Sequence, residues 1–350
     1  MNPALVDVSV LLLFHARADN FAQVWAEVRK ARPARLFLYQ DGPRMIDRHG
    51  EAVSDWHQSK DYEGIMACRE LVSDENIDWQ CEVHRFYQER NVGCDPSGFI
   101  AHRWAFSLVD KCIVLEDDVV PSQAFFPFCK EMLDRYEHDD RIGMVAGFNI
   151  DEETPDMPYS YFFTSAFSIW GWASWRRVVE KWDEHYSFLD GGKTERQLEQ
   201  LIAERRLRRC TMRTFRGHAA TGKAYFETIF QAALLLQSQL AIMPRRNLIN
   251  NVGFSGESTH FQSSTLDTMP HQLRYIFTMD RHQLAFPLQH PPYVMEQADY
   301  RERMYKVYAW DHPFVKVCYS LEELWLNLCR GNFKTIAKAL CQRIRKWLRR

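Results

Sequence analysis

The sequence predicts an α/β fold, in which short buried strands alternate with amphipathic helices. Residues Val6–Phe14 form a nearly continuous apolar run, which is typical of a strand buried on both faces. Residues Phe21–Ala31 repeat their apolar side chains on one helical face, and Arg35–Tyr39 is a second apolar run. A strand, a helix and a strand at this spacing predict a right-handed βαβ unit.

The same alternation continues along the chain to about residue 260. Strands are expected over residues 80–86, 112–115, 142–148 and 240–244, and helices over 55–72, 99–109, 123–136, 176–182 and 226–239. Asp19 or Asn20 is expected to cap the first helix, and Ser122 the helix over 123–136, because their side-chain oxygens accept from free backbone N–H groups.

Composition excludes several classes of protein. The 350 residues are 46% hydrophobic and 26% charged, as in an ordinary globular chain, and a net charge of -2 indicates no nucleic-acid partner. The nine cysteines are scattered without a CxxC pair, which favours a reducing compartment. The apolar run Val8–Phe14 is too short for a membrane span or a signal peptide. We therefore expect a cytoplasmic protein.

Three adjacent acids follow the strand expected at 112–115. Glu116, Asp117 and Asp118 come where this strand ends, and Pro121 then interrupts regular pairing. Ligands of open α/β sheets bind beyond the carboxyl ends of the strands. Adjacent carboxylates repel one another, and a hard divalent cation that also binds phosphate oxygens would offset that repulsion. The triplet thus suggests a metal–diphosphate site, although a solvated acidic turn is the simpler alternative.

Two other turns offer polar side chains to the same edge of the sheet. Arg17 lies where the first strand passes into a helix, close to the helix N-terminus, where anions are favoured. Asp41, in the turn after the second strand, could accept hydrogen bonds from a base or a ribose. A solvated arginine and an ordinary Asp-Gly turn remain open as alternatives.

The second half contains candidates for the chemistry itself. Glu227 begins an apolar helix, where it could be a general base for an acceptor hydroxyl or only a favourable charge at the helix start. The segment Ser165–Trp175 is rich in tryptophan, which suits sugar stacking or a packed core. His260 ends a polar loop and could ligate a metal or contact a phosphate, although a lone histidine often does neither.

These segments, in this order, resemble the GT-A-fold, nucleotide-sugar-dependent glycosyltransferases, including the N-acetylglucosaminyltransferase I family and the bacterial haemolytic-protein-like glycosyltransferases. The similarity covers roughly residues 6 to 262. The matching pieces are Val8–Asn20, Tyr39–Gly42, His102–Phe106, Val114–Asp118, Phe125–Phe126, Trp170–Trp172 and Asn247–His260.

The resemblance implies a Rossmann-like mixed sheet flanked by helices, and an inverting, metal-dependent transfer from a nucleotide sugar, with UDP expected. It implies that Asp118 binds Mn²⁺ (or Mg²⁺) and that Glu116 and Asp117 contact the ribose and sugar. It further implies that the nucleotide is held by Arg17, Asp41 and Arg103, and that Glu227 is the base. The acceptor would be a saccharide or a lipid-linked saccharide in bacterial surface polysaccharide synthesis.

The domain organisation expected is a glycosyltransferase domain over 1–264, with a nucleotide half to about 120 and an acceptor half from 121, then an extension over 265–350. Residues 330–350 carry eight basic side chains and no acid, with apolar residues at helical spacing. They predict a basic amphipathic helix on the anionic inner face of the plasma membrane, or a solvated terminal helix.

Two other functions remain open from the sequence. One is another metal-dependent phosphate enzyme, a nucleotidyltransferase or phosphodiesterase, although the turn after the first strand, residues 15–19, has no glycine. The other is a non-catalytic membrane-binding protein, which only the basic C-terminus favours. The six arginines over residues 205–216 could meet a lipid pyrophosphate, a membrane or only solvent.

Overall fold

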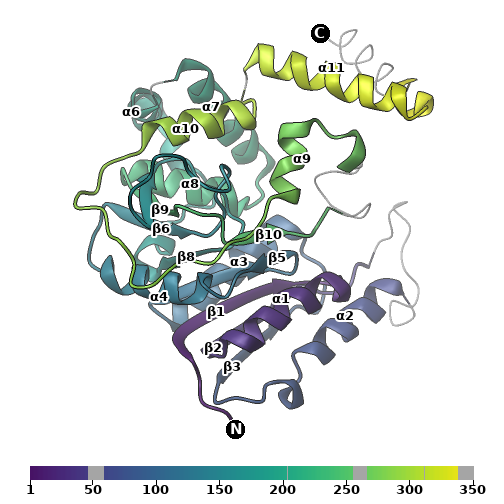
Figure 1. The fold of residues 1–350 in the computed structure, drawn as a ribbon, viewed down its shortest axis with the longest axis vertical. Helices are drawn as coiled ribbons and strands as arrows, with labels where there is room; N and C mark the ends of the chain where they lie inside the picture. Colours follow the sequence, from purple (N-terminus) through teal and green to yellow (C-terminus); the bar gives the residue numbers. More distant parts are fainter. Residues whose placement is uncertain (46–58, 203, 255–265, 311, 338–350) are drawn as a thin grey trace.

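The computed structural model describes residues 1–45, 59–202, 204–254, 266–310 and 312–337. It contains an eight-stranded mixed sheet in the order β3-β2-β1-β4-β8-β6-β9-β7, flanked by helices and followed by a helical C-terminal region (Figure 1). The predicted α/β class with a mixed sheet is therefore confirmed.

Most expected elements lie within a few residues of their predicted positions. The strands of the large sheet are β1 (Val6–Phe14), β2 (Pro33–Gln40), β3 (Glu82–Tyr87), β4 (Lys111–Glu116), β6 (Ile142–Ala146), β7 (Tyr161–Thr164), β8 (Trp172–Trp175) and β9 (Leu240–Pro244). A second, antiparallel pair joins β5 (Val119–Pro121) to β10 (Ile249–Asn251). The helices are α1 (Ala18–Ala31), α2 (Lys60–Leu71), α3 (Cys94–Leu108), α4 (Phe125–Arg135), α5 (Arg176–Val179), α6 (Lys193–Leu201), α7 (Arg205–Thr221), α8 (Phe226–Leu236), α9 (His271–Thr278), α10 (Ala298–Val307) and α11 (Pro313–Cys329).

The chain reverses direction across the sheet between β1 and β4. β1 pairs in parallel with β2 on one side and with β4 on the other, and Leu13 lies opposite Glu116. From β1 the chain moves outward through β2 to β3, and it then returns to the other side of β1 as β4. The connections that leave the carboxyl ends of β1 and β4 therefore diverge, which is the arrangement that opens a ligand crevice in α/β sheets.

The predicted helix caps are wrong for both helices that adjoin this crevice. α1 begins at Ala18 with Arg17 as its N-cap, so Asp19 lies inside the first turn, where its charge still favours the helix. α4 has Ala124 as its N-cap, without a side-chain cap. The backbone N–H of Ser122 donates to the Leu248 carbonyl at 2.8 Å, because Ser122 directly continues the β5–β10 pairing.

Tryptophans of the aromatic segment belong to the core. Trp172 and Trp175 are buried on β8, and the indole N–H of Trp175 donates to the Leu133 carbonyl at 3.0 Å. Trp170 is half-buried against Phe148 and Phe277. Because β8 pairs with both β4 and β6, packing accounts for these buried rings without a sugar ligand.

His102 is a fully buried, uncharged residue in the aromatic layer beside β8. Its ring lies 5.1 Å from Trp172, 5.3 Å from Trp182 and 4.9 Å from Phe226, measured between ring centroids. Burial lowers the pKa of His102 to about 3. The charged imidazolium is therefore much less stable in the folded chain than in the unfolded chain.

This burial should make the protein acid-sensitive. An unfolded histidine has a pKa near 6.5, so the contribution of neutral His102 is fully present above pH 6.5 and is lost as the pH falls towards 3. The loss should reach about 2 kcal/mol at pH 5. His102→Leu is therefore expected to flatten the dependence of the melting temperature on pH between about 6.5 and 4.5. The exposed His138→Leu variant is the control, and parallel curves for His102→Leu and the wild type would contradict the prediction.

Candidate functional site

An arginine and two acids meet where β1 and β4 end. The guanidinium of Arg17 binds Asp117 through Nη2 and through Nε, with Nε 3.4 Å from Oδ2, and its Nη1 lies 3.0 Å from Asp118 Oδ2. The backbone N–H of His15 also donates to Asp117 Oδ2 at 3.3 Å. The β1–β4 pairing thus brings together the predicted site residues Arg17, Asp117 and Asp118 from opposite ends of a hundred-residue segment.

Glu116 and Glu227 complete what we call the acid cluster, Glu116, Asp117, Asp118 and Glu227. Burial raises the pKa of Glu116 well above its usual range, and the charges of Asp118, Glu227 and Asp117 raise it further. Burial and the charge of Asp117 likewise raise the pKa of Asp118. Burial alone would lower the pKa of Arg17, but the two aspartates more than offset this and raise it. One guanidinium thus leaves the four carboxylates with an excess of negative charge, which favours a cation.

Three helices begin at or beside residues that are coupled electrostatically to the acid cluster. Arg17 is the N-cap of α1, and Glu227 is the second residue of α8. α3 begins at Cys94, whose thiol pKa is raised by burial and then by the charges of Glu116 and Glu227. Helix N-termini carry partial positive charge and free backbone N–H groups. Their presence lowers the cost of gathering the acids and suits an anion such as a diphosphate.

The close packing of α8 on α3 places Glu227 in the cluster. A Cβ atom on Gly98 of α3 would lie 2.3 Å from a ring carbon of Phe226, which directly precedes Glu227. Only a residue without a side chain therefore allows α8 to approach α3 this closely. Glu227 is half-buried, and its charge is one of those that raise the pKa of Glu116.

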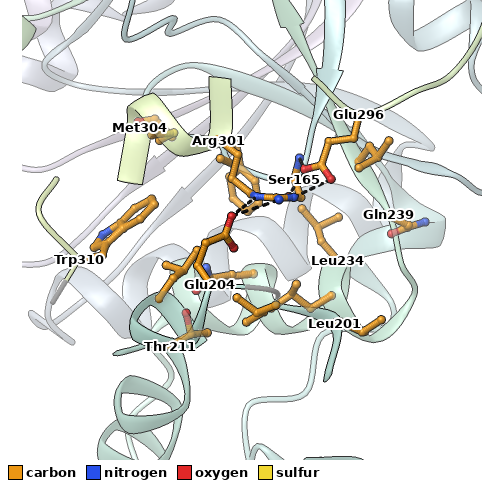
Figure 2. A pocket seen from close by; sticks show the side chains of 18 of the residues that line it. Ser165, Leu201, Glu204, Thr211, Leu234, Gln239, Glu296, Arg301, Met304 and Trp310 are labelled. Carbon is orange, nitrogen blue, oxygen red and sulfur yellow. Dashed lines mark hydrogen bonds and ion pairs between the residues drawn. The ribbon is translucent and has the colours of Figure 1, made fainter. Parts of the chain in front are cut away.

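Glu227 also lines a cavity of about 450 Å³, on the side towards the C-terminal half. Its wall is mainly apolar, with Phe167, Leu235 and Met304 among its residues. Figure 2 shows the guanidinium of Arg301 between two acids on this wall. Arg301 lies 2.7 Å from Glu296 and 3.2 Å from Glu204, measured between nitrogen and carboxylate oxygen. The cavity therefore combines an apolar wall with an ordered charged group.

Asp118 lies against the β10 segment on its other side. Its Oδ1 accepts from Asn251 Nδ2 at 3.5 Å, and its carbonyl accepts from the Val252 N–H at 2.8 Å. A Cβ atom on Gly253 would lie 2.0 Å from Asp118 Oδ2, so the glycine leaves room for this carboxylate. Carboxylate oxygens suit Mn²⁺ or Mg²⁺, and Mg²⁺ in particular is often held by only one or two carboxylates plus substrate phosphates. Asp118 therefore offers one carboxylate to the predicted cation.

The described part of the chain contains no site at which protein side chains alone would hold a metal ion. Within residues 1–45, 59–202, 204–254, 266–310 and 312–337, no group of three or more His, Cys, Asp and Glu side chains could hold a metal ion. His260, the second predicted ligand, lies outside the described residues. A cation at Asp118 would consequently depend on oxygens of a bound substrate.

Asp41 and Arg103 lie outside the acid cluster. Asp41 is buried and accepts from the backbone N–H groups of Gly42, Val92 and Gly93 at 2.9, 2.9 and 3.2 Å, and from Asn91 Nδ2 at 2.8 Å. It therefore fixes the loop that leads into α3. Arg103 is exposed further along α3, and its Nη1 donates to the Val179 carbonyl at 3.3 Å. Contact of either side chain with a nucleotide stays a prediction.

The role of Asp41 in this loop can be tested by stability. Asp41→Ala leaves the N–H groups of residues 42, 92 and 93 without their acceptor, which should cost about 1–3 kcal/mol of unfolding free energy. Urea denaturation measures this loss. Asp7→Ala, which removes an exposed partner of Arg35, should change the unfolding free energy far less. Equal effects in both variants would contradict the structural role.

Three residues of this region were not predicted from the sequence. Asn251 contacts Asp118, Gly98 sets the approach of α8, and Arg301 lies on the cavity wall. The Asn-Asn-Val-Gly run at 250–253 was a weak signal for the first. No sequence pattern links Arg301 on α10 to Glu204 before α7, because their pairing depends on the folded chain.

Comparison with known proteins identifies no family. No family model matches the sequence, and no curated protein matches it. Similar solved structures include the UTP-bound UGPase from Acinetobacter baumannii (10% identity, 70% of this chain and 88% of that chain, TM-score 0.35). Others are the inositol-1-phosphate CTP transferase from T. maritima (7%, 78% and 96%, TM-score 0.36) and HddC from Yersinia pseudotuberculosis (12%, 53% and 84%, TM-score 0.31). TM-scores of this size are too low to decide a function.

Proposed function

We propose that this chain is a metal-dependent glycosyltransferase of the GT-A type. It would move a sugar from a nucleotide diphosphate, with UDP expected, to a saccharide or lipid-linked acceptor. The observation that carries the proposal is the position of Glu227. This carboxylate is coupled electrostatically to Glu116, and it also lines the 450 Å³ cavity. A transferase needs a group in this position, with a donor on one side and an acceptor on the other.

The donor side rests on Arg17 and the acids at the carboxyl ends of β1 and β4. Arg17 has five N–H donors, and Asp117 and Asp118 accept three of them, so two remain for a phosphate oxygen. The N-termini of α1, α3 and α8 add their partial charges at the same place. Glu116 and Asp117 would contact the ribose and sugar, with Asp41 and Arg103 as further predicted contacts to the nucleotide.

A divalent cation, Mn²⁺ or Mg²⁺, would be held by Asp118 together with the donor diphosphate. When bound, it would neutralise negative charge on the departing nucleotide diphosphate. Asn251 and Gly253 keep the Asp118 carboxylate in place for this purpose.

The acceptor side rests on Glu227 and the cavity. A hydroxyl group of the acceptor would lie between Glu227 and the anomeric carbon of the donor. As its oxygen forms the new bond to that carbon, the hydroxyl proton would pass to Glu227, and the bond to the diphosphate would break. A single displacement of this kind inverts the anomeric configuration.

The metal assignment can be tested with Asp118→Asn. Thermal shift of the wild type with UDP and Mn²⁺ together should show stabilisation that neither gives alone, of about 2.7 kcal/mol at a ligand concentration of 100 times Kd. Asp118→Asn should lose this shift while keeping its own melting transition, and its transfer rate should fall by about 10²–10³-fold or more. Full activity in this variant would exclude Asp118 as the ligand.

The base assignment makes a different prediction for Glu227→Gln. The glutamine cannot accept the acceptor proton, so kcat should fall by about 10²–10⁴-fold, while the shift with UDP and Mn²⁺ persists. Glu180→Gln, at an exposed position after α5, is the matched control. An unchanged kcat for Glu227→Gln would place the base elsewhere.

Products distinguish the transferase from the other phosphate enzymes. A screen of nucleotide sugars with Mn²⁺ should release a nucleoside diphosphate, most readily from a UDP-sugar. Release of pyrophosphate from a nucleoside triphosphate and a sugar phosphate would instead identify a nucleotidyltransferase. The cellular role that we propose is bacterial surface polysaccharide synthesis, in which the acceptor is membrane-linked.

A further inference from the structure

The C-terminal helix α11 presents its apolar side to solvent. Its exposed residues include Phe314 (72% exposed), Leu321 (60%) and Trp325 (61%). The full set recurs three or four residues apart along one face and comprises Phe314, Val317, Leu321, Leu324, Trp325 and Leu328. Figure 1 shows α11 at the end of the molecule opposite the N-terminus, beyond α9 and α10.

The side of α11 that faces the protein includes several polar residues. Tyr319 donates to the Val307 carbonyl at 2.9 Å, and the Glu322 carboxylate accepts from the His271 N–H at 2.8 Å. Asn327 is only 5% exposed. A surface helix of a globular protein normally turns its apolar stripe inward and its polar side outward. α11 has the reverse orientation, so its stripe needs an apolar partner outside the part of the chain that the structure describes.

Positive charge accompanies this apolar face. Arg330 and Lys334 directly follow the helix, and the sequence from residue 330 to 350 holds eight basic side chains and no acid. An apolar helical face next to a basic segment is the combination that binds anionic lipid surfaces. A tryptophan in the stripe fits the same partner, since indoles favour the boundary between headgroups and acyl chains.

We propose that α11 lies in the surface of an anionic membrane, with its exposed stripe in the boundary between headgroups and acyl chains. At 1.5 Å per residue its 17 residues extend about 25 Å, which suits a helix lying in the plane of the membrane. Among the helices of the described residues, none is long and apolar enough to cross a membrane. The docking element is therefore α11 itself, which precedes the basic segment predicted from the sequence.

This orientation would bring the cavity close to the lipid surface. Tyr308 and Trp310 line the cavity, and the chain enters α11 at Pro313. α7 also lies near the cavity, since Glu204, its N-cap, pairs with Arg301 of α10, and Arg205 and Arg206 follow as exposed residues. Access of a lipid-linked acceptor to this cavity rests on the proposed function. The binding of α11 to a membrane does not depend on the proposed function.

Vesicle co-sedimentation of the full chain tests the proposal. Wild-type protein should bind vesicles of phosphatidylcholine and phosphatidylglycerol at 4:1 and bind pure phosphatidylcholine at least tenfold more weakly, because the basic segment needs anionic headgroups. The double variant Leu321→Glu, Trp325→Glu should weaken binding to the anionic vesicles at least tenfold. Both positions are exposed, so its circular dichroism and melting temperature should match those of the wild type. Leu108→Glu, at an exposed apolar residue of α3, is the matched control and should bind as the wild type does.

The alternative partner for the stripe is a second copy of this chain. If wild-type protein forms a dimer that Leu321→Glu, Trp325→Glu dissociates, and it ignores anionic vesicles, the membrane proposal is overturned. Equal vesicle binding by the double variant and the wild type would also overturn it. Nucleotide-sugar hydrolysis in the same samples reports separately on the proposed function, so failure of one proposal is distinguishable from failure of the other.

Discussion

The pairing of Arg17 with Asp117 and Asp118 is the interaction on which the candidate site depends. β1 and β4 are neighbours in the sheet, so the residue after β1 and the acids after β4 meet at one edge. Three of the five N–H groups of one guanidinium are thereby engaged. Without this cation the two buried aspartates would repel each other across the crevice, and one of them would favour its protonated form.

The same site leaves its acids incompletely neutralised. Glu116 and Glu227 add two carboxylates to the aspartates, and their mutual charge raises the pKa of Glu116. The N-termini of α1, α3 and α8 offset part of this charge without supplying a full positive one. A carboxyl group whose pKa is raised by burial together with neighbouring charges is typical of a functional site, which is why we interpret this cluster as functional.

Sequence alone was sufficient for the fold class and for the expectation that Arg17 lies near the acids after β4. Apolar runs and helical spacing located the strands and helices, because burial on both faces or on one face imposes different periodicities. Ligands of α/β sheets bind beyond the carboxyl ends of the strands, so Arg17 after β1 and the acids after β4 were expected to lie close together. They do, because the ends of neighbouring parallel strands share one edge of the sheet. The predictions of the helix caps were wrong. Ser122 continues the β5–β10 pairing, and Arg17 is the N-cap of α1.

Tertiary structure decided what depends on contacts between distant segments. Gly98 allows α8, which contains Glu227, to pack closely on α3. Asp41 accepts hydrogen bonds from the loop before α3. The apolar residues of α11 look like an ordinary helical face in the sequence. Only the packing of its polar side on the protein shows that the stripe points outward. Periodicity determines that a helix has two faces, whereas the direction of each face is set by the neighbours that the chain brings to it.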